Sequence, residues 1–191
     1  MAWKVDTAHS SVEFAVRHMM ISTVRGRFEK FDVTVDLDEN RPELASITAT
    51  IDTASINTRE EKRDAHLRSA DFFDAENNPQ ITFKSTKVEQ KGHEDFLITG
   101  DLTIRGETHP VTFKAHSEGK GKSPFGYTAW GFSASTTINR KDWGLNWNVA
   151  LETGGWLVAD EIKINLEVEL AQQADAPAVQ AEANAEAQAT A

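Results

Sequence analysis

The chain has 191 residues, a net charge of −10 and a pI near 5.0, and it contains no cysteine. The acidic balance disfavours nucleic acid and anionic membranes as main partners, because both select a basic surface. The lack of thiols excludes disulfides, thiolate metal sites and a cysteine nucleophile. The length suits one domain, and a hydrophobic content of 39% is typical of strands that each have one wet face.

The N-terminal residues MAWKVDTAHSSVEF contain no basic segment followed by an apolar run, and no stretch of the sequence approaches 18 apolar residues. The pattern therefore predicts neither a secretory signal nor a membrane-spanning helix. We expect a cytoplasmic protein without stable membrane insertion. A leader removed from the chain would instead make it periplasmic.

Alternation of apolar and polar residues predicts about eight strands along the chain. The segments KGHED, RGETHP and SEGKGKSPFGY have the composition of turns and loops between them. In chain order, the apolar positions of the predicted strands are Val12, Phe14 and Val16; Phe31, Val33, Val35 and Leu37; Ile47, Ala49 and Ile51; Ile81 and Phe83; Phe96, Ile98, Gly100, Leu102 and Ile104; Val111, Phe113 and Ala115; Trp130, Phe132, Ala134, Thr136 and Ile138; and Ile162, Ile164, Leu166, Val168 and Leu170.

These strands are two-faced and follow one another without a regular rhythm of helices, which predicts an antiparallel all-β domain. Such a set closes either as a sandwich or as a barrel. The long run from Phe28 to Leu37 favours a barrel wall. The inward faces combine large phenylalanines with small residues such as Gly100, Ala115 and Ala134. These either interdigitate in a filled core or leave a tunnel.

One segment between two predicted strands breaks the period of two. TREEKRDAHLRSADFF, residues 58–73, predicts one short helix with Asn57 or Thr58 as its N-cap. The spacing of Asp64 and Arg68 allows them to pair along its surface. After it, Pro79 ends the irregular part and the strand pattern resumes.

The cations of this segment allow two interpretations. Arg59, Arg63 and His66 form either a cationic patch for a phosphate or carboxylate head group, or a solvated helix face with internal ion pairs. The charge pattern does not separate the two.

Local motifs for catalysis, metals or cofactors do not occur in the sequence. The histidines show no HxH, HxxxH or HExxH spacing, and HSSVEF is not a GxSxG elbow. His9, His18 and His66 could meet only through the fold. We therefore predict no metal site, no cofactor and no catalytic residue.

The composition changes at Ala171, where AQQADAPAVQAEANAEAQATA begins, without an aromatic or basic residue. A segment with so little to bury is typical of disorder. We expect one domain over residues 1–170 and a disordered tail over residues 171–191.

Five segments in order resemble the YceI-like family of lipocalin-like polyisoprenoid-binding proteins. They are WKVDTAHSSVEFAVRHM with VRGRFEKF, IDTASINTREEKRDAHLRSADFFDAENNPQITFKS, GDLTIRGETHPVTF, INRKDWGLNWN and VADEIKINLEVEL, and they span about residues 2–170. The resemblance implies an eight-stranded antiparallel lipocalin-like β-barrel with a short helical insertion and no enzymatic activity. It implies a polyisoprenoid, isoprenoid quinone precursor or other long-chain lipid in the interior, for storage or transport. Because some members form dimers, it also allows a homodimer.

With a lipid in the interior, the inward residues of the strands and the cations of the insertion become candidate ligand contacts. The alternative to a lipid carrier is an enzyme that acts on the head group of an amphiphile, with His66 as general base beside Arg63. Trp143 and Trp147 either line the pocket or seal its outside. The expected tunnel residues are Phe14, Val16, Phe28, Phe31, Phe72, Phe73, Phe83, Leu102, Phe113 and Phe132, and the expected head-group residues are Arg59, Arg63 and His66.

Overall fold

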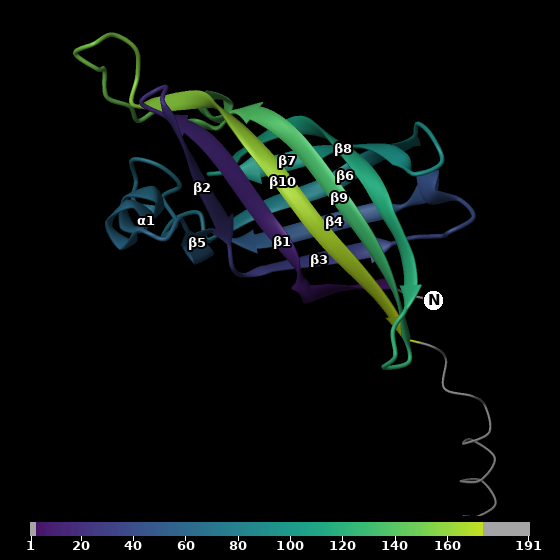
Figure 1. Ribbon diagram of the computed structural model, residues 1–191. Helices are drawn as coiled ribbons and strands as arrows, with labels where there is room; N and C mark the ends of the chain where they lie inside the picture. The colour runs from purple at the N-terminus through teal and green to yellow at the C-terminus, as the bar shows by residue number, and fades with distance from the viewer. Residues whose placement is uncertain (1–2, 174–191) are drawn as a thin grey trace, which may run out of the picture.

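A computed structural model describes residues 3–173, which form a closed antiparallel β-barrel (Figure 1). β1 pairs with β3 on one side and with β10 on the other, which closes the ring. The predicted fold class, an eight-stranded barrel with a short helical insertion, is confirmed. The eight wall strands are β1 (Trp3–His18), β3 (Phe31–Asp36), β4 (Ser46–Asp52), β6 (Gln80–Gln90), β7 (Asp95–Ile104), β8 (Glu107–Lys122), β9 (Tyr127–Asn139) and β10 (Val158–Gln173).

β1 has two different partners on the same edge. Its first residues, Trp3 and Lys4, pair with β3, whereas its second half pairs with β2 (Ser22–Phe28). β2 in turn pairs with the short strand β5 (Ile56–Asn57). The prediction of one strand from Phe28 to Leu37 is therefore wrong, because the chain leaves β2 at Phe28 and starts β3 at Phe31.

A bulge in β1 lies between these two pairings. Asp6 is opposite Glu169 of β10 and Ser11 is opposite Glu167, so four residues of β1 lie opposite one residue of β10. Extra residues in one strand bend it and increase its twist. The bulge thus accompanies the change of partner along β1.

The turn between β7 and β8 is shorter than predicted. Arg105 and Gly106 have φ values of 50° and 79°, typical of a two-residue hairpin turn. Pro110 therefore belongs to β8, opposite Asp101, and precedes Lys114, where pairing with β9 begins. Its missing N–H costs no bond on that unpaired edge. β8 also continues to Lys122, so the first half of the predicted loop SEGKGKSPFGY is strand.

The insertion between β4 and β6 carries the helix α1 (Glu61–Arg68), which is shorter than the predicted helix. Its N-cap is Glu60, whose carboxylate accepts the N–H groups of Lys62 and Arg63. The prediction of Asn57 or Thr58 as the cap is wrong, because Arg59 has a left-handed φ of 65° and the helix starts after it. Three short 3₁₀ turns, at Pro42–Leu44, Thr53–Ser55 and Arg140–Trp143, complete the described elements.

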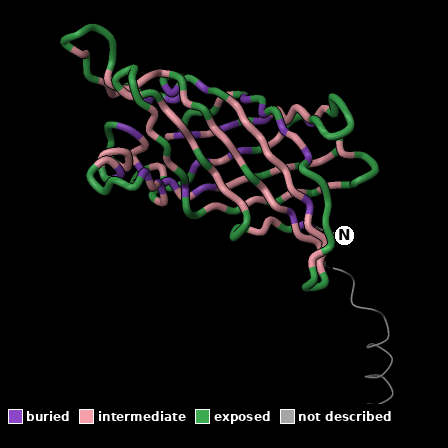
Figure 2. Tube along the Cα trace, viewed as in Figure 1, coloured by how far each residue is buried: buried purple, intermediate pink, exposed green. Residues whose placement is uncertain are grey.

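The buried apolar residues form two clusters. The larger cluster includes Ile56, Phe72, Trp143 and Leu145 at the α1 end and continues along β4, β6, β7, β8 and β9. Trp3, Trp130 and Leu170 form the smaller cluster at the other end. Between the two ends, the inward residues of β1, β3, β9 and β10 are mostly of intermediate burial, whereas β6, β7 and β8 carry buried residues such as Ile81, Leu102 and Phe113 (Figure 2). Packing is therefore closer along β6, β7 and β8 than along the rest of the wall.

Two further findings concern the chain ends and the helices. β10 runs to Gln173 and pairs there with β9, three residues beyond the predicted domain end at 170. The rest of the predicted tail, residues 174–191, lies outside the described residues. Among the residues that are described, no helix combines the length and the apolar character needed to cross a bilayer.

Candidate functional site

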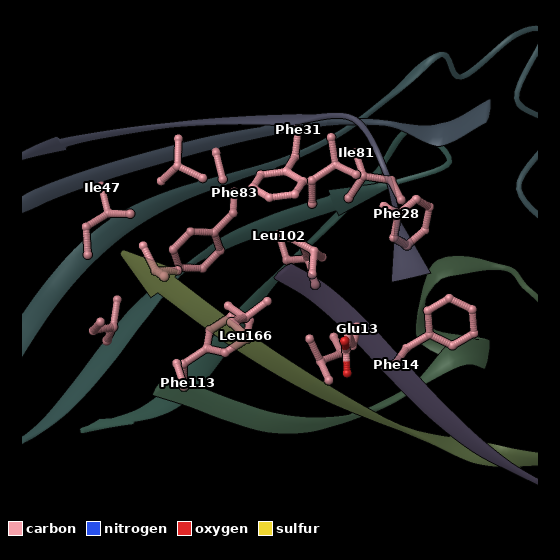
Figure 3. A pocket seen from close by; sticks show the side chains of 18 of the residues that line it. Glu13, Phe14, Phe28, Phe31, Ile47, Ile81, Phe83, Leu102, Phe113 and Leu166 are labelled. Atoms are coloured by element: carbon pink, nitrogen blue, oxygen red, sulfur yellow. The ribbon is translucent and has the colours of Figure 1, made fainter. Parts of the chain in front are cut away.

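A cavity of about 290 Å³ lies inside the barrel (Figure 3). It extends from Leu37 and Pro42 at one end to Phe72 and Leu145 at the α1 end, and every wall strand contributes to its lining. The side chains that reach it are almost all aliphatic or aromatic. The cavity is therefore an apolar compartment of the size that small-molecule sites have.

Many of the residues that line the cavity are only half-buried although they face inward. Their remaining exposed surface faces the cavity, since all of them line it. These side chains have no apolar partner on the cavity side. Each methylene group moved from water into the cavity would contribute about 0.8 kcal/mol to the free energy of binding. These residues are Val12, Phe14, Val16, Phe31, Val33, Val35, Ile47, Ala49, Phe96, Ile98, Phe132, Ala134, Ile162, Ile164, Leu166 and Val168.

The structure brings all ten predicted tunnel residues to this cavity. Their contact with a ligand stays a prediction. The sequence analysis did not name the lining residues Pro42, Ala45, Leu67 and Leu145, which lie outside the alternating strands and carry no periodic signal. Val33 and Val35 were predicted as apolar strand positions but not as tunnel residues, although they alternate with polar residues in the same way as Phe31.

Two glycines let phenylalanine rings lie flat against the wall. A Cβ atom at Gly100 would lie 2.4 Å from Cζ of Phe83, and one at Gly26 would lie 2.4 Å from Cζ of Phe14. Both distances are far below van der Waals contact, so each ring occupies the space of the missing side chain. Large and small residues thus interdigitate along the wall, and a cavity remains beside them.

The Arg63 side chain holds the insertion together. Its Nε donates to the Thr58 hydroxyl at 2.8 Å, and its Nη2 donates to the Thr58 carbonyl oxygen at 2.9 Å. The Thr58 hydroxyl donates in turn to Asp64 at 2.6 Å, and the same carboxylate accepts the Thr58 N–H at 2.9 Å. Asp64 is 6% exposed and does not pair with Arg68 as predicted. This network favours a structural role for the RDAHL cluster.

Arg59 and His66 lie apart from the cavity as well. Arg59 is exposed, and Nε2 of His66 lies 2.9 Å from a carboxylate oxygen of Asp71. The His66 ring also packs edge-on against Phe72 and Trp147, with centroid distances of 5.1 and 4.6 Å. None of the three predicted head-group residues lines the cavity.

Arg68 also acts as a tie within the insertion. Its guanidinium donates to the carbonyl oxygens of Ala54 at 2.8 Å and Ile56 at 3.0 Å. Arg105 adds a bond from the β7–β8 turn to the carbonyl oxygen of Phe72 at 2.7 Å. The cations of this end therefore satisfy backbone carbonyls that the irregular chain leaves without partners.

Arg140 is a lining residue that the sequence analysis missed. It is 2% exposed and donates to the carbonyl oxygens of Ala159 at 3.0 Å and Trp147 at 2.9 Å, and also to that of Leu145. Burial lowers the pKa of its guanidinium, and the nearby Asp160 carboxylate opposes that shift. Next to Lys141 and Asp142 it looks like a surface charge, so no sequence signal marks it as buried.

The two tryptophans of WGLNW seal the α1 end. Trp143 is buried, and its Nε1 donates to the Leu102 carbonyl oxygen at 3.0 Å. Trp147 packs against the His66 and Phe72 rings. Neither residue lines the cavity, which answers the question that the sequence left open.

Among the described residues, one group on the bulge of β1 could hold a metal ion: Asp6, His9 and Glu169 offer ligand atoms within 4.8 Å of one another. Nδ1 of His9 already lies 2.9 Å from an Asp6 carboxylate oxygen. This hydrogen bond is the main reason why the pKa of His9 is raised and that of Asp6 is lowered. An ion pair accounts for the cluster without a metal. His18 and His66 are not part of it.

An antiparallel eight-stranded barrel with an apolar interior places the protein among the lipocalin-like barrels. The chain belongs to the YceI-like family, because the model of the YceI-like domain matches residues 3–170. UPF0312 proteins of Staphylococcus epidermidis and Staphylococcus aureus are 42% identical to it over 165 residues, covering 86% of this chain and 94% of each relative. The predicted family is confirmed.

Solved structures of the family share the fold. BcnA of Burkholderia cenocepacia is 28% identical, with a TM-score of 0.75 and coverage of 86% of this chain and 98% of BcnA. A Campylobacter jejuni YceI protein is 33% identical, with a TM-score of 0.72 and coverage of 83% and 90%. A polyisoprenoid binding domain from Saccharophagus degradans, implicated in plant cell wall breakdown, has the same fold at 13% identity and a TM-score of 0.61, with coverage of 89% and 98%.

Proposed function

We propose that the protein binds a long-chain amphiphilic lipid, such as a polyisoprenoid or an isoprenoid quinone precursor, and stores or transports it. The lipid chain occupies the barrel cavity. The observation that carries this proposal is the apolar cavity that all eight wall strands line, with half-buried apolar residues from β1, β3, β4, β7, β9 and β10 facing it. Membership of the YceI-like family supports it, and a neighbour with the same fold is described as polyisoprenoid-binding.

The energetics of such binding need no specific polar contact with the chain. A dozen buried carbons would contribute roughly 10 kcal/mol before the cost of ordering the lipid. Two charged residues occur among those that line the cavity. The Arg140 guanidinium is bonded to backbone carbonyls, and the Glu13 side chain is exposed. For the head group we propose a place at the α1 end near Arg59 and His66, while Arg63 holds the insertion.

An enzyme that acts on a head group has less support from the geometry. Nε2 of His66, the candidate general base, is paired with Asp71, and the ring lies outside the cavity lining. The Arg63 guanidinium is bonded to Thr58. We therefore propose binding without catalysis.

Organic extraction of the purified protein and native mass spectrometry test the proposal. We expect a co-purified long-chain lipid that is released when the protein unfolds. Ala134→Phe fills the cavity from β9 and should reduce the bound lipid at least about tenfold, as expected for the loss of a few methylene contacts. Ser135→Phe, at the next position on the outer face of β9, is the matched control and should keep the lipid. A purified protein that contains no lipid and takes up no added polyprenol would refute the proposal.

A further inference from the structure

Large apolar side chains are exposed together at one corner of the barrel. In the turn between β1 and β2, Met19 is 41%, Met20 68% and Ile21 76% exposed. In the loop before β10, Val149 is 47% and Trp156 56% exposed. We call these five residues the apolar tip. Soluble proteins rarely expose such a group without a binding role.

The two segments of the apolar tip are bonded to each other. The Met19 N–H donates to the Leu157 carbonyl oxygen at 2.8 Å, and the Leu157 N–H donates to the Val149 carbonyl oxygen at 2.9 Å. The Met20 sulfur lies so close to Gly155 that a Cβ atom there would be 2.7 Å away. Figure 1 shows the loop before β10 extending beyond the barrel at the upper left, with the turn between β1 and β2 at its base, and Figure 2 shows the loop as largely exposed.

The backbone of the turn does not favour the residues it carries. Met19 and Met20 have φ values of 50° and 62°, and the Ile21 N–H donates to the His18 carbonyl oxygen at 3.1 Å. A β-turn with positive φ at both central residues prefers Asn and Gly there, because side chains with a Cβ are strained. The turn geometry therefore gives no reason for methionine at these two positions, and the reason must lie in what the side chains contact. Strain of this kind is typical of functional positions.

The apolar tip is continuous with the wall of the cavity. His18 pairs with Val158, and both Val158 and Val16 line the cavity. Val158 follows Leu157, the residue that bonds Met19. A partner held by the apolar tip would thus lie next to one end of the lipid compartment.

We propose that the apolar tip docks on the surface of a zwitterionic lipid bilayer, with Met20, Ile21 and Trp156 inserted at its interface. Tryptophan and flexible methionine suit this boundary, because one has a polar N–H on an apolar ring and the other adapts its shape. Five side chains on a convex loop pair are few beside the roughly 20–30 residues per side of a stable protein interface. The net charge of −10 favours zwitterionic over anionic lipid.

Docking of this kind would bring the cavity end formed by Val16 and Val158 to the membrane, where lipid can exchange. That role in exchange rests on the proposed function. The docking itself does not, since it can be measured without a bound ligand.

Flotation with phosphatidylcholine vesicles tests the docking. The variant Met19→Asn with Met20→Gly removes two tip side chains and supplies the residues that the turn prefers. We expect the vesicle-bound fraction to fall at least about tenfold, while the thermal midpoint rises by about 2–4 °C. If the variant is more stable and does not bind vesicles, misfolding cannot explain the loss of binding. The matched control is Leu44→Ser with Phe125→Ser, which removes side chains exposed by 60% and 86% at the opposite end of the barrel and should bind as the natural protein does.

Several results would overturn the proposal. The proposal fails if the natural protein does not float, if the tip variant floats as well as the natural protein, or if flotation requires added phosphatidylglycerol. A concentration-dependent dimer that the tip variant abolishes, without flotation, would identify a second copy as the partner. Co-purified lipid without flotation would refute the docking and leave the proposed function intact. Flotation of a protein whose cavity never holds a lipid would support the docking and refute the proposed function.

Discussion

The middle of the barrel and its α1 end bury their side chains in different ways. In the middle, inward residues such as Phe31 and Val33 remain half-buried because they face the cavity. At the α1 end, Ile56 is 1% and Trp143 2% exposed, and the buried Asp64 and Arg140 are bonded to neighbouring groups. The buried charges of the α1 end therefore hold the chain together through hydrogen bonds, whereas the alternating strands surround the space for a ligand.

Removing Arg140 should damage the frame most. Arg140→Met leaves the buried carbonyl oxygens of Leu145, Trp147 and Ala159 without their donor. We expect the free energy of unfolding to fall by about 3–5 kcal/mol, as when a buried charge network loses one partner. Urea unfolding followed by circular dichroism measures it. The exposed neighbour provides the control Lys141→Met, and equal losses for both would contradict the buried network.

Removing Asp64 should have the next largest effect. Asp64→Ala leaves the Thr58 N–H and hydroxyl without their buried acceptor. We expect a loss of about 2–3 kcal/mol in the free energy of unfolding. Amide hydrogen exchange should show lost protection in the insertion before the barrel wall opens. Glu61→Ala, an exposed change in the same helix, should cost less than about 0.5 kcal/mol.

Truncation in the middle of the wall should cost less than truncation of a fully buried residue. Leu166 faces the cavity and is half-buried, whereas Leu102 lines the same cavity but is 5% exposed. We expect about 1–2 kcal/mol for Leu166→Ala and about 2–5 kcal/mol for Leu102→Ala in lipid-free protein. Bound lipid should raise the cost at Leu166. Equal costs without lipid would show that the middle is a packed core.

The smallest effect concerns an ion pair on the outer wall. Nδ1 of His116 lies 2.9 Å from an Asp95 carboxylate oxygen, and this hydrogen bond raises the pKa of His116 above its usual 6.5. The pair's contribution to stability is thus complete below pH 6.5 and is lost as the pH rises through the raised pKa. NMR titration of His116 should show that pKa returning toward 6.5 in Asp95→Asn. An unchanged titration would exclude Asp95 as the cause.

Much of the wall could be predicted from the sequence because buried and exposed residues alternate along a strand with a period of two. The inward positions Phe83, Phe113 and Phe132 were found in this way, and all of them line the cavity. The helix was found by its broken period. Its cap was not, because Arg59 has a left-handed φ and the helix begins only after it, with Glu60 as the cap.

The features that the sequence did not reveal depend on contacts between distant segments. Arg140 is buried because its guanidinium meets carbonyl oxygens as far along the chain as Ala159. The division of β1 between β2 and β3 depends on the bulge that follows Asp6. The alternation within β1 is the same with either partner, so it carries no information about which strand lies alongside.

The pairing of β1 with β10 has a consequence for folding on the ribosome. Lys4 lies opposite Ala171, so the barrel closes only when nearly the whole domain has been synthesised. Until then β1 and β9 are open edges that can pair with other chains. Contacts between residues so far apart in the chain also make folding slow. A nascent chain therefore has no closed compartment for lipid, and loading must follow release of the last strand.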